Sequence, residues 1–437
     1  MDLSHIDPHG QLCFVVGEPS GDRLGAELLD ALRGSLPHCR VFGLVGPRLA
    51  ERGVEVILPM EEIAVMGFTA VLRRLPTVLR AMDRMEKEIL QRRPEGVILI
   101  DSPGFTLRLA RKLRQHGYQG KIMLYVSPSV WAHGAKRVEA MARDLDMVLC
   151  LFPFEPHYYQ HTSLDVRYVG CPLLDRVDQT EAGPSDSPEL TAQVLESLPK
   201  GHPLIGLFPG SRRQDVHAHL PRMLDSARLL LLARPHLRFA LSCSQEGMDE
   251  LISTLIRSPE DPLQLGQTLF LVDQSSTLSL MRHCRAAIAK SGTITLELAL
   301  LRVPTVVVYA VSWINALIIH YLLKVNLPFY SIANILGQYA DDLRQGRIPS
   351  TKNQPVIQDT AGSFSSQWLR VAPFPELLAR DFRTELVIQA LLPLVDDGAM
   401  RTASLEGCDR IRELLKTETS PSSQAAAAVI ECLSRHA

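Results

Sequence analysis

The chain has 437 residues, enough for two or three domains, and its 46% hydrophobic and 22% charged residues are typical of a soluble globular protein. Its 46 basic and 48 acidic residues leave a formal net charge of −2, which argues against nucleic acid as a main partner. No signal peptide and no uncharged apolar run of about 18 residues stands out, so we expect neither secretion nor a membrane-spanning helix.

Apolar strand-like runs alternate with amphipathic helix-length segments along the first half. The predicted strands are LCFVV, RVFGLV, VEVILP, GVILID, KIMLYV and DMVLCLF, and the predicted helices are 22–32, 47–52, 71–91, 105–116 and 134–143. This alternation predicts an α/β fold, a doubly wound parallel sheet with helices on both faces. Ligands then bind beyond the carboxyl ends of the strands.

The pattern lapses between Asp175 and Lys200 and then resumes, which predicts a second doubly wound domain with a cleft between the two. We expect domains at 1–175 and 176–395, an irregular insertion at about 337–375, and C-terminal helices in 396–437 that pack on the N-terminal domain or on a dimer partner. WINALIIHYLLK is a further helix candidate, and the last helices are expected at 376–391, 399–417 and 422–435. The eight cysteines form no C-x-x-C pair, so we expect reduced thiols in a cytoplasmic protein.

The stretch AAIAKSGTITLELAL (286–300) reads as a strand, a turn and a helix. Gly292 allows close approach of a ligand, and Ser291, Thr293 and Thr295 carry hydroxyls near a helix start that suits a phosphate. Glu297 can accept hydrogen bonds from sugar hydroxyls. A plain βα turn that merely starts a helix explains the same residues.

The first predicted strand ends at GEPSGD, where Gly17, Glu18, Ser20, Gly21 and Asp22 suit a ligand-binding loop. The spacing is not G-x-G-x-x-G, which weakens any reading as a dinucleotide site. A simple turn with Asp22 as a helix cap is the alternative.

Asp101 ends the strand GVILID. A carboxylate at this position can act as a general base that takes a proton from a sugar hydroxyl, or it can cap the next helix. YVSPSVWA leaves the next strand, and its Ser127, Ser129 and Trp131 can line a sugar site, although a buried tryptophan in a core loop is the commoner outcome.

The second half offers FPGSRR after its first strand. Gly210 and Ser211 form the turn, and Arg212 can hold a diphosphate and stabilise the charge that grows on a leaving group. No Asp-x-Asp metal site lies near it, so we expect no metal and no other cofactor.

A candidate membrane patch lies between residues 66 and 85. Its apolar residues are bordered by arginines, as in an interfacial helix, but packing against the chain's own sheet explains the same stripe. The apolar residues that we assign to the patch are Met66, Phe68, Val71, Leu72 and Leu75.

Nine stretches in order make the chain resemble one family, the lipid-A-disaccharide synthases, which are inverting GT-B glycosyltransferases. They are GEPSGD (17–22), IAVMGF (63–68), IDSPGF (100–105), YVSPSVWA (125–132), LFPFEPHYY (151–159), VGCPLLD (169–175), LFPGSRRQDV (207–216), KSGTITLE (290–297) and SIANILG (331–337).

The resemblance implies transfer of diacylglucosamine from UDP-2,3-diacylglucosamine to the 6-hydroxyl of 2,3-diacylglucosamine 1-phosphate, with a β-1,6 link formed and UDP released. It implies Asp101 as general base, Arg212 and the 291–297 turn as the UDP site, Glu297 at the ribose and a functional Asn334. It also implies a peripheral protein on the cytoplasmic face of the inner membrane, and a homodimer with exchanged C-terminal segments.

The chain departs from the family pattern at Gly104, at His133-Gly134 and at Cys171, which concerns acceptor binding. Two other functions therefore stay open: an isomerase similar to UDP-N-acetylglucosamine 2-epimerase, and a non-catalytic protein of the same fold that binds a nucleotide sugar.

Overall fold

The computed structural model of the protein describes residues 10–63, 68–131, 135–182, 201–243, 248–256, 260–273, 276–310, 329–347, 369 and 371–435. It divides into two compact units, which are described separately: unit 1 is Met1–Pro172 with Lys416–Ala437, and unit 2 is Leu173–Leu415. The chain thus crosses between the units twice. The expected C-terminal segment 396–437 is split by this division, because helix α16 (Ala399–Leu415) belongs to unit 2 and helix α17 (Pro421–Ser434) to unit 1.

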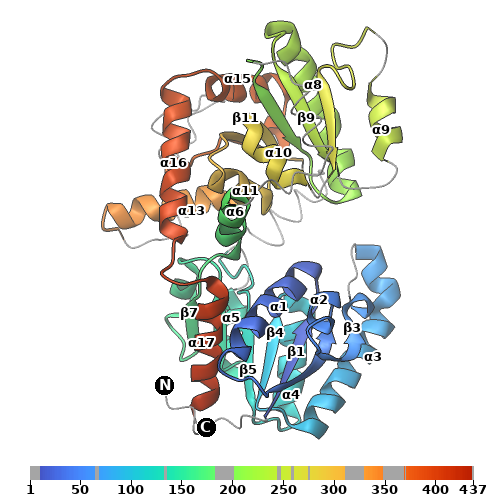
Figure 1. Ribbon diagram of the computed structural model, residues 1–437, viewed down its shortest axis with the longest axis vertical. Coiled ribbons are helices and arrows are strands. Elements are labelled where there is room, and N and C mark those ends of the chain that lie inside the picture. The colour runs from blue at the N-terminus through green and yellow to red at the C-terminus, as the bar shows by residue number, and fades with distance from the viewer. Residues whose placement is uncertain are drawn as a thin grey trace. The chain divides into compact units, whose positions relative to one another are not determined.

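Unit 1 is built on a seven-stranded parallel sheet with the order β3-β2-β1-β4-β5-β6-β7 (Figure 1). Its elements are β1 (Gln11–Val16), α1 (Pro19–Arg33), β2 (Arg40–Val45), α2 (Pro47–Ala50), β3 (Glu55–Pro59), η1 (Met60–Glu62), α3 (Phe68–Arg92), β4 (Gly96–Ile100), α4 (Pro103–Gln115), β5 (Lys121–Tyr125), α5 (Ala135–Asp144), β6 (Met147–Cys150), η2 (Glu155–Tyr159), β7 (Asp165–Tyr168) and α17. The strand order reverses between β1 and β4, and their carboxyl ends form the crevice expected to bind a ligand.

Alternate residues of β1 enter two different cores. Cys13 and Val15 pack with α3 and α4 on one face of the sheet, whereas Phe14 and Val16 pack with α1 and α17 on the other. A strand that is apolar at every position is therefore buried on both sides, as a parallel sheet requires.

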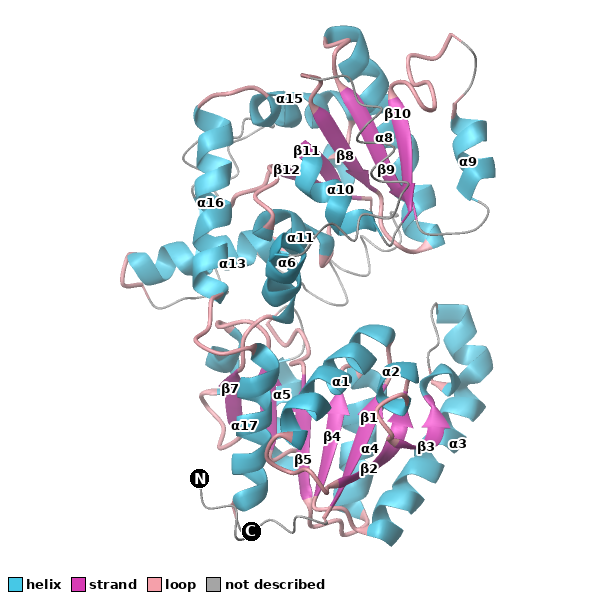
Figure 2. Ribbon diagram, in the orientation of Figure 1, coloured by secondary structure: helices cyan, strands magenta, loops and turns pink. Residues whose placement is uncertain are grey.

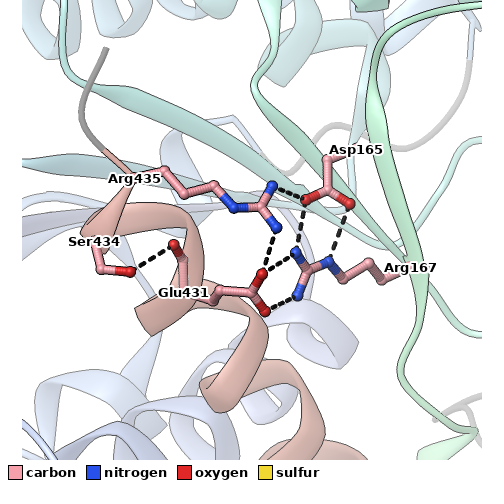
Figure 3. A network of polar contacts seen from close by, with 5 residues as sticks. All are labelled: Asp165, Arg167, Glu431, Ser434 and Arg435. Carbon is pink, nitrogen blue, oxygen red and sulfur yellow. Dashed lines mark hydrogen bonds and ion pairs between the residues drawn. The ribbon is translucent and has the colours of Figure 1, made fainter. Parts of the chain in front are cut away.

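Helix α17 is fixed to the edge strand β7 by a network of arginines and carboxylates (Figure 3). Arg167 on β7 contacts Glu431 through two nitrogens, at 2.5 and 2.9 Å, and Asp165 at 2.8 Å. Arg435 joins the same Asp165 carboxylate at 2.8 Å. Helix α17 also packs against α1. The network and this packing together place the end of the chain on unit 1.

Unit 2 contains a six-stranded parallel sheet with the order β10-β9-β8-β11-β12-β13 (Figure 2). Its elements are α6 (Pro172–Ala182), β8 (Leu204–Phe208), α8 (Arg213–Ala233), β9 (Arg238–Cys243), α9 (Met248–Leu255), β10 (Leu269–Asp273), α10 (Thr277–His283), β11 (Cys284–Lys290), α11 (Ile294–Leu300), β12 (Thr305–Tyr309), α13 (Ile332–Arg344), β13 (Glu376–Leu378), η5 (Ala379–Asp381), α15 (Thr384–Val395) and α16. The order again reverses between the first and fourth strands, here β8 and β11. The predicted fold class of two doubly wound parallel sheets is confirmed.

Two sequence predictions in unit 2 are wrong. The insertion expected from Gly337 begins as helix α13, because the glycine packs closely rather than breaking the helix: a Cβ atom there would lie 2.7 Å from the carbonyl oxygen of Val371. The helix expected from Glu376 begins instead as strand β13, which pairs with β12 and extends the sheet by one strand. Most of the insertion, and the apolar run WINALIIHYLLK, lie outside the described residues.

Candidate active site

The loop that follows β8 leads into the first turn of α8. Gly210 has φ +113°, and a Cβ atom there would lie 2.8 Å from the Cβ atom of Asp215, so only glycine fits without strain. Arg212 is the N-cap residue of α8 and is exposed, and within the described part of the chain no side chain caps this helix. The N–H groups of the first turn are therefore available to an anion.

A cavity of about 480 Å³ opens beside this loop at the switch point between β8 and β11. The residues that line it come from four helices and three strands or their ends. They are Arg176, Phe208, Gly210, Ser211, Arg212, Asp215, Ser242, Thr277, Leu278, Lys290, Gly292, Thr293, Ile294 and Glu297. The structure thus brings Gly210, Ser211 and Arg212 together with Gly292, Thr293 and Glu297, as the strand-end argument predicts.

The charges in the cavity are unequal. Arg176, Arg212 and Lys290 face two carboxylates, Asp215 and Glu297. Lys290 Nζ lies 3.4 Å from Asp215 Oδ2 and 5.7 Å from the centre of the Tyr309 ring. Three cations beside an uncapped helix start favour an anionic ligand such as a diphosphate. Sequence reasoning missed Arg176 and Asp215, which come from helices whose packing the local pattern does not reveal.

Glu297 lies on α11, where it lines the cavity and is largely buried. Burial raises the pKa of its carboxyl, and the Arg176 guanidinium, 3.8 Å away, acts against that rise. The carboxylate is thus held beside a cation in a position where it can accept hydrogen bonds from hydroxyl groups of a ligand.

His219 fixes the first turn of α8 and was not found from the sequence. Its Nε2 accepts a hydrogen bond from Ala310 N at 2.8 Å, so Nδ1 must carry the hydrogen that it donates to Asp215 O at 2.7 Å. Burial lowers the pKa of this imidazole. A neutral histidine therefore ties the helix start to the end of β12.

In the turn after β11, some side chains hold the turn by hydrogen bonds and other residues line the cavity. Ser291 Oγ donates to Tyr330 O at 3.0 Å, and the buried Thr295 Oγ1 donates to Gly292 O at 2.7 Å. Gly292 and Thr293 lie between these two and face the cavity. Ser291 and Thr295 therefore shape the turn rather than line its cavity.

Asn334 is fully buried and bound to the backbone of Phe374 and to the side chain of Glu376. Its Nδ2 donates to Phe374 O at 2.7 Å and to Glu376 Oε1 at 2.8 Å, and its Oδ1 accepts from Phe374 N at 3.0 Å. These contacts hold the segment before β13. Asn334 therefore has a structural role in holding this segment.

The corresponding edge of unit 1 carries Asp101 directly after β4. Asp101 and Ser102 adopt φ values of +57° and +47°, which cost about 1–3 kcal/mol each for residues other than glycine. Asp101 Oδ1 accepts from Ser102 N at 2.8 Å. Strain in two consecutive residues at a strand end is a feature of functional sites, where it sets the direction of a side chain.

Gly17, at the end of the adjacent strand β1, lies against the same loop. A Cβ atom on Gly17 would lie 2.1 Å from Ser102 Oγ, so the glycine allows the two strand ends to meet. Glu18 and Ser20 are exposed beside it, and Gly21 is buried in α1. The structure therefore places the GEPSGD loop next to Asp101.

Asp22 serves another element. Its buried carboxylate accepts from the backbone nitrogens of Gly46, Arg48 and Leu49 at 3.0, 2.8 and 3.3 Å. It therefore caps the start of α2 rather than its own helix. This use accounts for its burial without a ligand.

The loop after β5 contains two serines, one buried and one exposed. Ser127 is buried and its Oγ lies 2.8 Å from the Tyr159 hydroxyl, whereas Ser129 is exposed. Trp131 is half-buried, with its ring edge-on to the buried Phe154 at 5.8 Å. Among the predicted sugar-site residues of this loop, Ser129 and Trp131 are therefore the accessible ones.

The predicted membrane patch is described only in part. Met66 lies outside the described residues; Phe68, Val71 and Leu72 belong to the helical backbone of α3; and Leu75 is 38% exposed. Leu79, one turn further along, is 46% exposed. Of the helices that the structure describes, none is long and apolar enough to cross a bilayer.

Comparison with known proteins decides the family. A model described as Lipid-A-disaccharide synthetase matches residues 12–341. The chain belongs to this family. It is 35% identical over 425 residues to the Lipid-A-disaccharide synthase of Pseudomonas aeruginosa (strain UCBPP-PA14), which covers 97% of this chain and 98% of that protein. The resemblance seen in the sequence motifs is confirmed.

Two further comparisons concern the family and the fold. The chain is 36% identical over 333 residues to the Lipid-A-disaccharide synthase of Chlamydia pneumoniae, matching 76% of this chain and 52% of that protein's length. The UDP-GlcNAc 2-epimerase of Neisseria meningitidis, solved with UDP-GlcNAc, has a TM-score of 0.54 at 10% identity over 96% of this chain and 98% of that one. At this identity the likeness shows the shared GT-B fold alone.

Proposed function

We propose that the chain is a lipid-A-disaccharide synthase. It transfers diacylglucosamine from UDP-2,3-diacylglucosamine to 2,3-diacylglucosamine 1-phosphate, forming a β-1,6-linked disaccharide 1-phosphate and UDP. Membership of the family supports this substrate class. The observation that carries the proposal in the structure is the cavity of unit 2, whose three cations and open helix start suit the diphosphate of UDP.

The chemistry follows from the two strand-end sites. The 6-hydroxyl oxygen of the acceptor attacks C1 of the donor sugar, the C1–O bond to UDP breaks, and the hydroxyl proton passes to the carboxylate of Asp101. Arg212 and Lys290 stabilise the negative charge that develops on the departing diphosphate. Glu297 binds the ribose hydroxyls. This set of residues needs no metal ion for leaving-group stabilisation.

Incubation of the purified chain with both lipid substrates tests this function. Disaccharide 1-phosphate and UDP should appear in equal amounts. Conversion of UDP-N-acetylglucosamine to its 2-epimer without disaccharide would favour the isomerase, and binding of UDP-sugar without any conversion would favour the non-catalytic alternative.

Replacing Arg212 with alanine should weaken UDP binding and slow turnover together, each by about tenfold or more, because a charge-assisted contact contributes about 1.5–3 kcal/mol. Isothermal titration with UDP and steady-state kinetics measure the two effects. Arg213→Ala is the matched control: this neighbouring arginine is exposed and does not line the cavity. Equal losses in both variants would remove the specific role of Arg212.

We also propose that α3 binds the inner-membrane surface from the cytoplasmic side. Leu75 and Leu79 are exposed one turn apart, and Arg80 and Arg84 on the same helix are exposed as well. Apolar side chains beside arginines suit an interface with anionic lipids.

Replacing both Leu75 and Leu79 with serine should release the chain from vesicles of phosphatidylglycerol and phosphatidylethanolamine, lowering the bound fraction in flotation about tenfold. Leu232→Ser is the control, because Leu232 on α8 of unit 2 is 68% exposed and lies outside the patch. Unchanged flotation of the double variant would remove this patch from membrane binding.

A homodimer is the last part of the proposal. Within the described chain α17 packs on unit 1 of the same molecule, so exchange of this helix with a second copy would reproduce contacts that already exist. Sedimentation equilibrium measures the oligomeric state, and a mass of one chain would contradict the homodimer.

A further inference from the structure

Glu376, the first residue of β13, holds the loop that enters α13. Its Oε2 accepts from Tyr330 N at 2.8 Å, and its Oε1 accepts from Ser331 N at 2.9 Å and from Asn334 Nδ2 at 2.8 Å. Ser331 is the N-cap residue of α13, yet its own side chain caps nothing. One carboxylate from a distant strand therefore binds two successive backbone donors and the first turn of the helix.

The two residues that Glu376 holds by their backbone also hold the turn after β11. Tyr330 O accepts from Ser291 Oγ at 3.0 Å, and Ser331 Oγ donates to Thr295 Oγ1 at 3.1 Å. These contacts meet the turn at both of its ends. Gly292 and Thr293, between the two ends, line the cavity.

The turn also has hydrogen bonds of its own: Ser291 N donates to Val308 O at 3.0 Å, and Thr295 N donates to Gly292 O at 3.2 Å. Thr293 is the N-cap residue of α11 without a side-chain cap, and among the residues that the structure describes only Lys290 Nζ lies as near as 4.0 Å to a Cβ atom placed on Gly292. An exposed Gly-Thr pair has high conformational entropy unless its flanks are held. The contacts that run back to Glu376 add to the restraint on the flanks, at Ser291 and at Thr295.

We propose that Glu376 is a positioning residue of the nucleotide-sugar cavity, which holds the Ser291–Thr295 turn in its binding conformation through Tyr330 and Ser331. The inference rests on the proposed function, since it takes the cavity to be the UDP site. Glu376 does not line the cavity and acts on the ligand only through the turn.

The test compares Glu376→Gln with the wild type at pH 8, because burial raises the pKa of Glu376 to about 7 and the carboxylate must be ionised. Glutamine keeps one acceptor oxygen but presents an NH₂ group to a backbone N–H, so at least one anchor is lost. The Kd for UDP and the KM for the UDP-sugar should rise about tenfold, whereas the KM for the acceptor should change less than twofold.

A double-mutant cycle separates positioning from a general structural role. Ser291→Ala should raise the Kd for UDP by a similar factor, and the double variant should bind no more weakly than either single one, because both changes break the same route. Glu385→Gln on α15, an exposed carboxylate in the same unit, should leave the Kd unchanged. If the Kd of the double variant rose by the product of the two single factors, the two residues would act independently and the proposed route would be wrong.

Other outcomes are also decisive. An unchanged Kd for UDP in Glu376→Gln, with normal binding by the wild type, overturns this inference alone. A wild type that binds no UDP overturns the proposed function and the inference with it. If Glu376→Gln does not fold by circular dichroism, Ser331→Ala and Ser291→Ala cut the two links individually and carry the same expectation of weaker UDP binding.

Discussion

Replacing Asp101 with asparagine should lower kcat for disaccharide formation on the order of a hundredfold or more and leave the Kd for UDP unchanged, because removal of a general base has effects of that scale. Asparagine retains an oxygen for the hydrogen bond from Ser102 N, so the strained loop keeps its local contact. UDP binding should be unaffected because every described residue that lines the cavity belongs to unit 2. Rapid-quench kinetics and titration with UDP measure the two quantities separately.

Asp30→Asn provides the matched control for this experiment. Asp30 lies on α1 of the same unit and pairs with Arg52 at the surface. The variant removes a carboxylate of equal size away from the crevice, and its kcat should equal that of the wild type. A fully active Asp101→Asn enzyme would remove Asp101 from the role of general base.

Apart from Glu297 on α11, the parts of the candidate site that sequence reasoning predicted share one property: they lie in the loops that follow directly after a strand. Gly210, Arg212 and the Gly292-Thr293 pair leave neighbouring parallel strands, so the sheet itself brings them to one edge. Asp101 is placed by the same rule in unit 1. A periodic pattern predicts strand ends, and strand ends predict which loops meet.

The parts that it did not predict depend on packing between distant elements. Arg176 reaches the cavity from α6, and Glu376 reaches the loop before α13 from β13, a strand that looked like the start of a helix. Asp22, Thr295 and Asn334 have residue types that bind ligands, but buried backbone groups must also find partners, and here these side chains supply them. A local pattern cannot distinguish these two uses of a polar side chain.

Glu155 presents the largest expected effect on stability. Burial raises the pKa of its carboxyl to about 8, while backbone N–H groups of Leu151 and Phe152 donate to the same oxygen, Oε2, at 3.1 and 3.0 Å and act against that rise. The folded chain therefore retains a proton that the unfolded chain loses above pH 4.5. The contribution of Glu155 to stability must fall as the pH rises from about 4.5 to 8, because this carboxyl binds more protons in the folded state throughout this window.

Glu155→Gln should remove this loss. Glutamine resembles the protonated acid, since its single oxygen can accept both backbone hydrogen bonds and its other group is a donor. At pH 9 the variant should be more stable than the wild type by up to about 5 kcal/mol, from 3.5 pKa units at 1.36 kcal/mol each. The advantage should nearly vanish at pH 4.5, and thermal unfolding at both pH values should show a difference in Tm on the order of 10 °C at pH 9 only.

The neighbouring groups do not compete with this interpretation. Burial also raises the pKa of Cys150 and of Tyr159, so both stay neutral below pH 9 and their ionisation adds nothing to the difference between variants. Glu139→Gln on α5, an exposed carboxylate of unit 1, should match the wild type at both pH values. A stability difference for Glu155→Gln that is the same at pH 4.5 and pH 9 would mean that Glu155 is not protonated in the folded chain, and that its buried carboxylate is fully stabilised by the turn at Leu151 and Phe152.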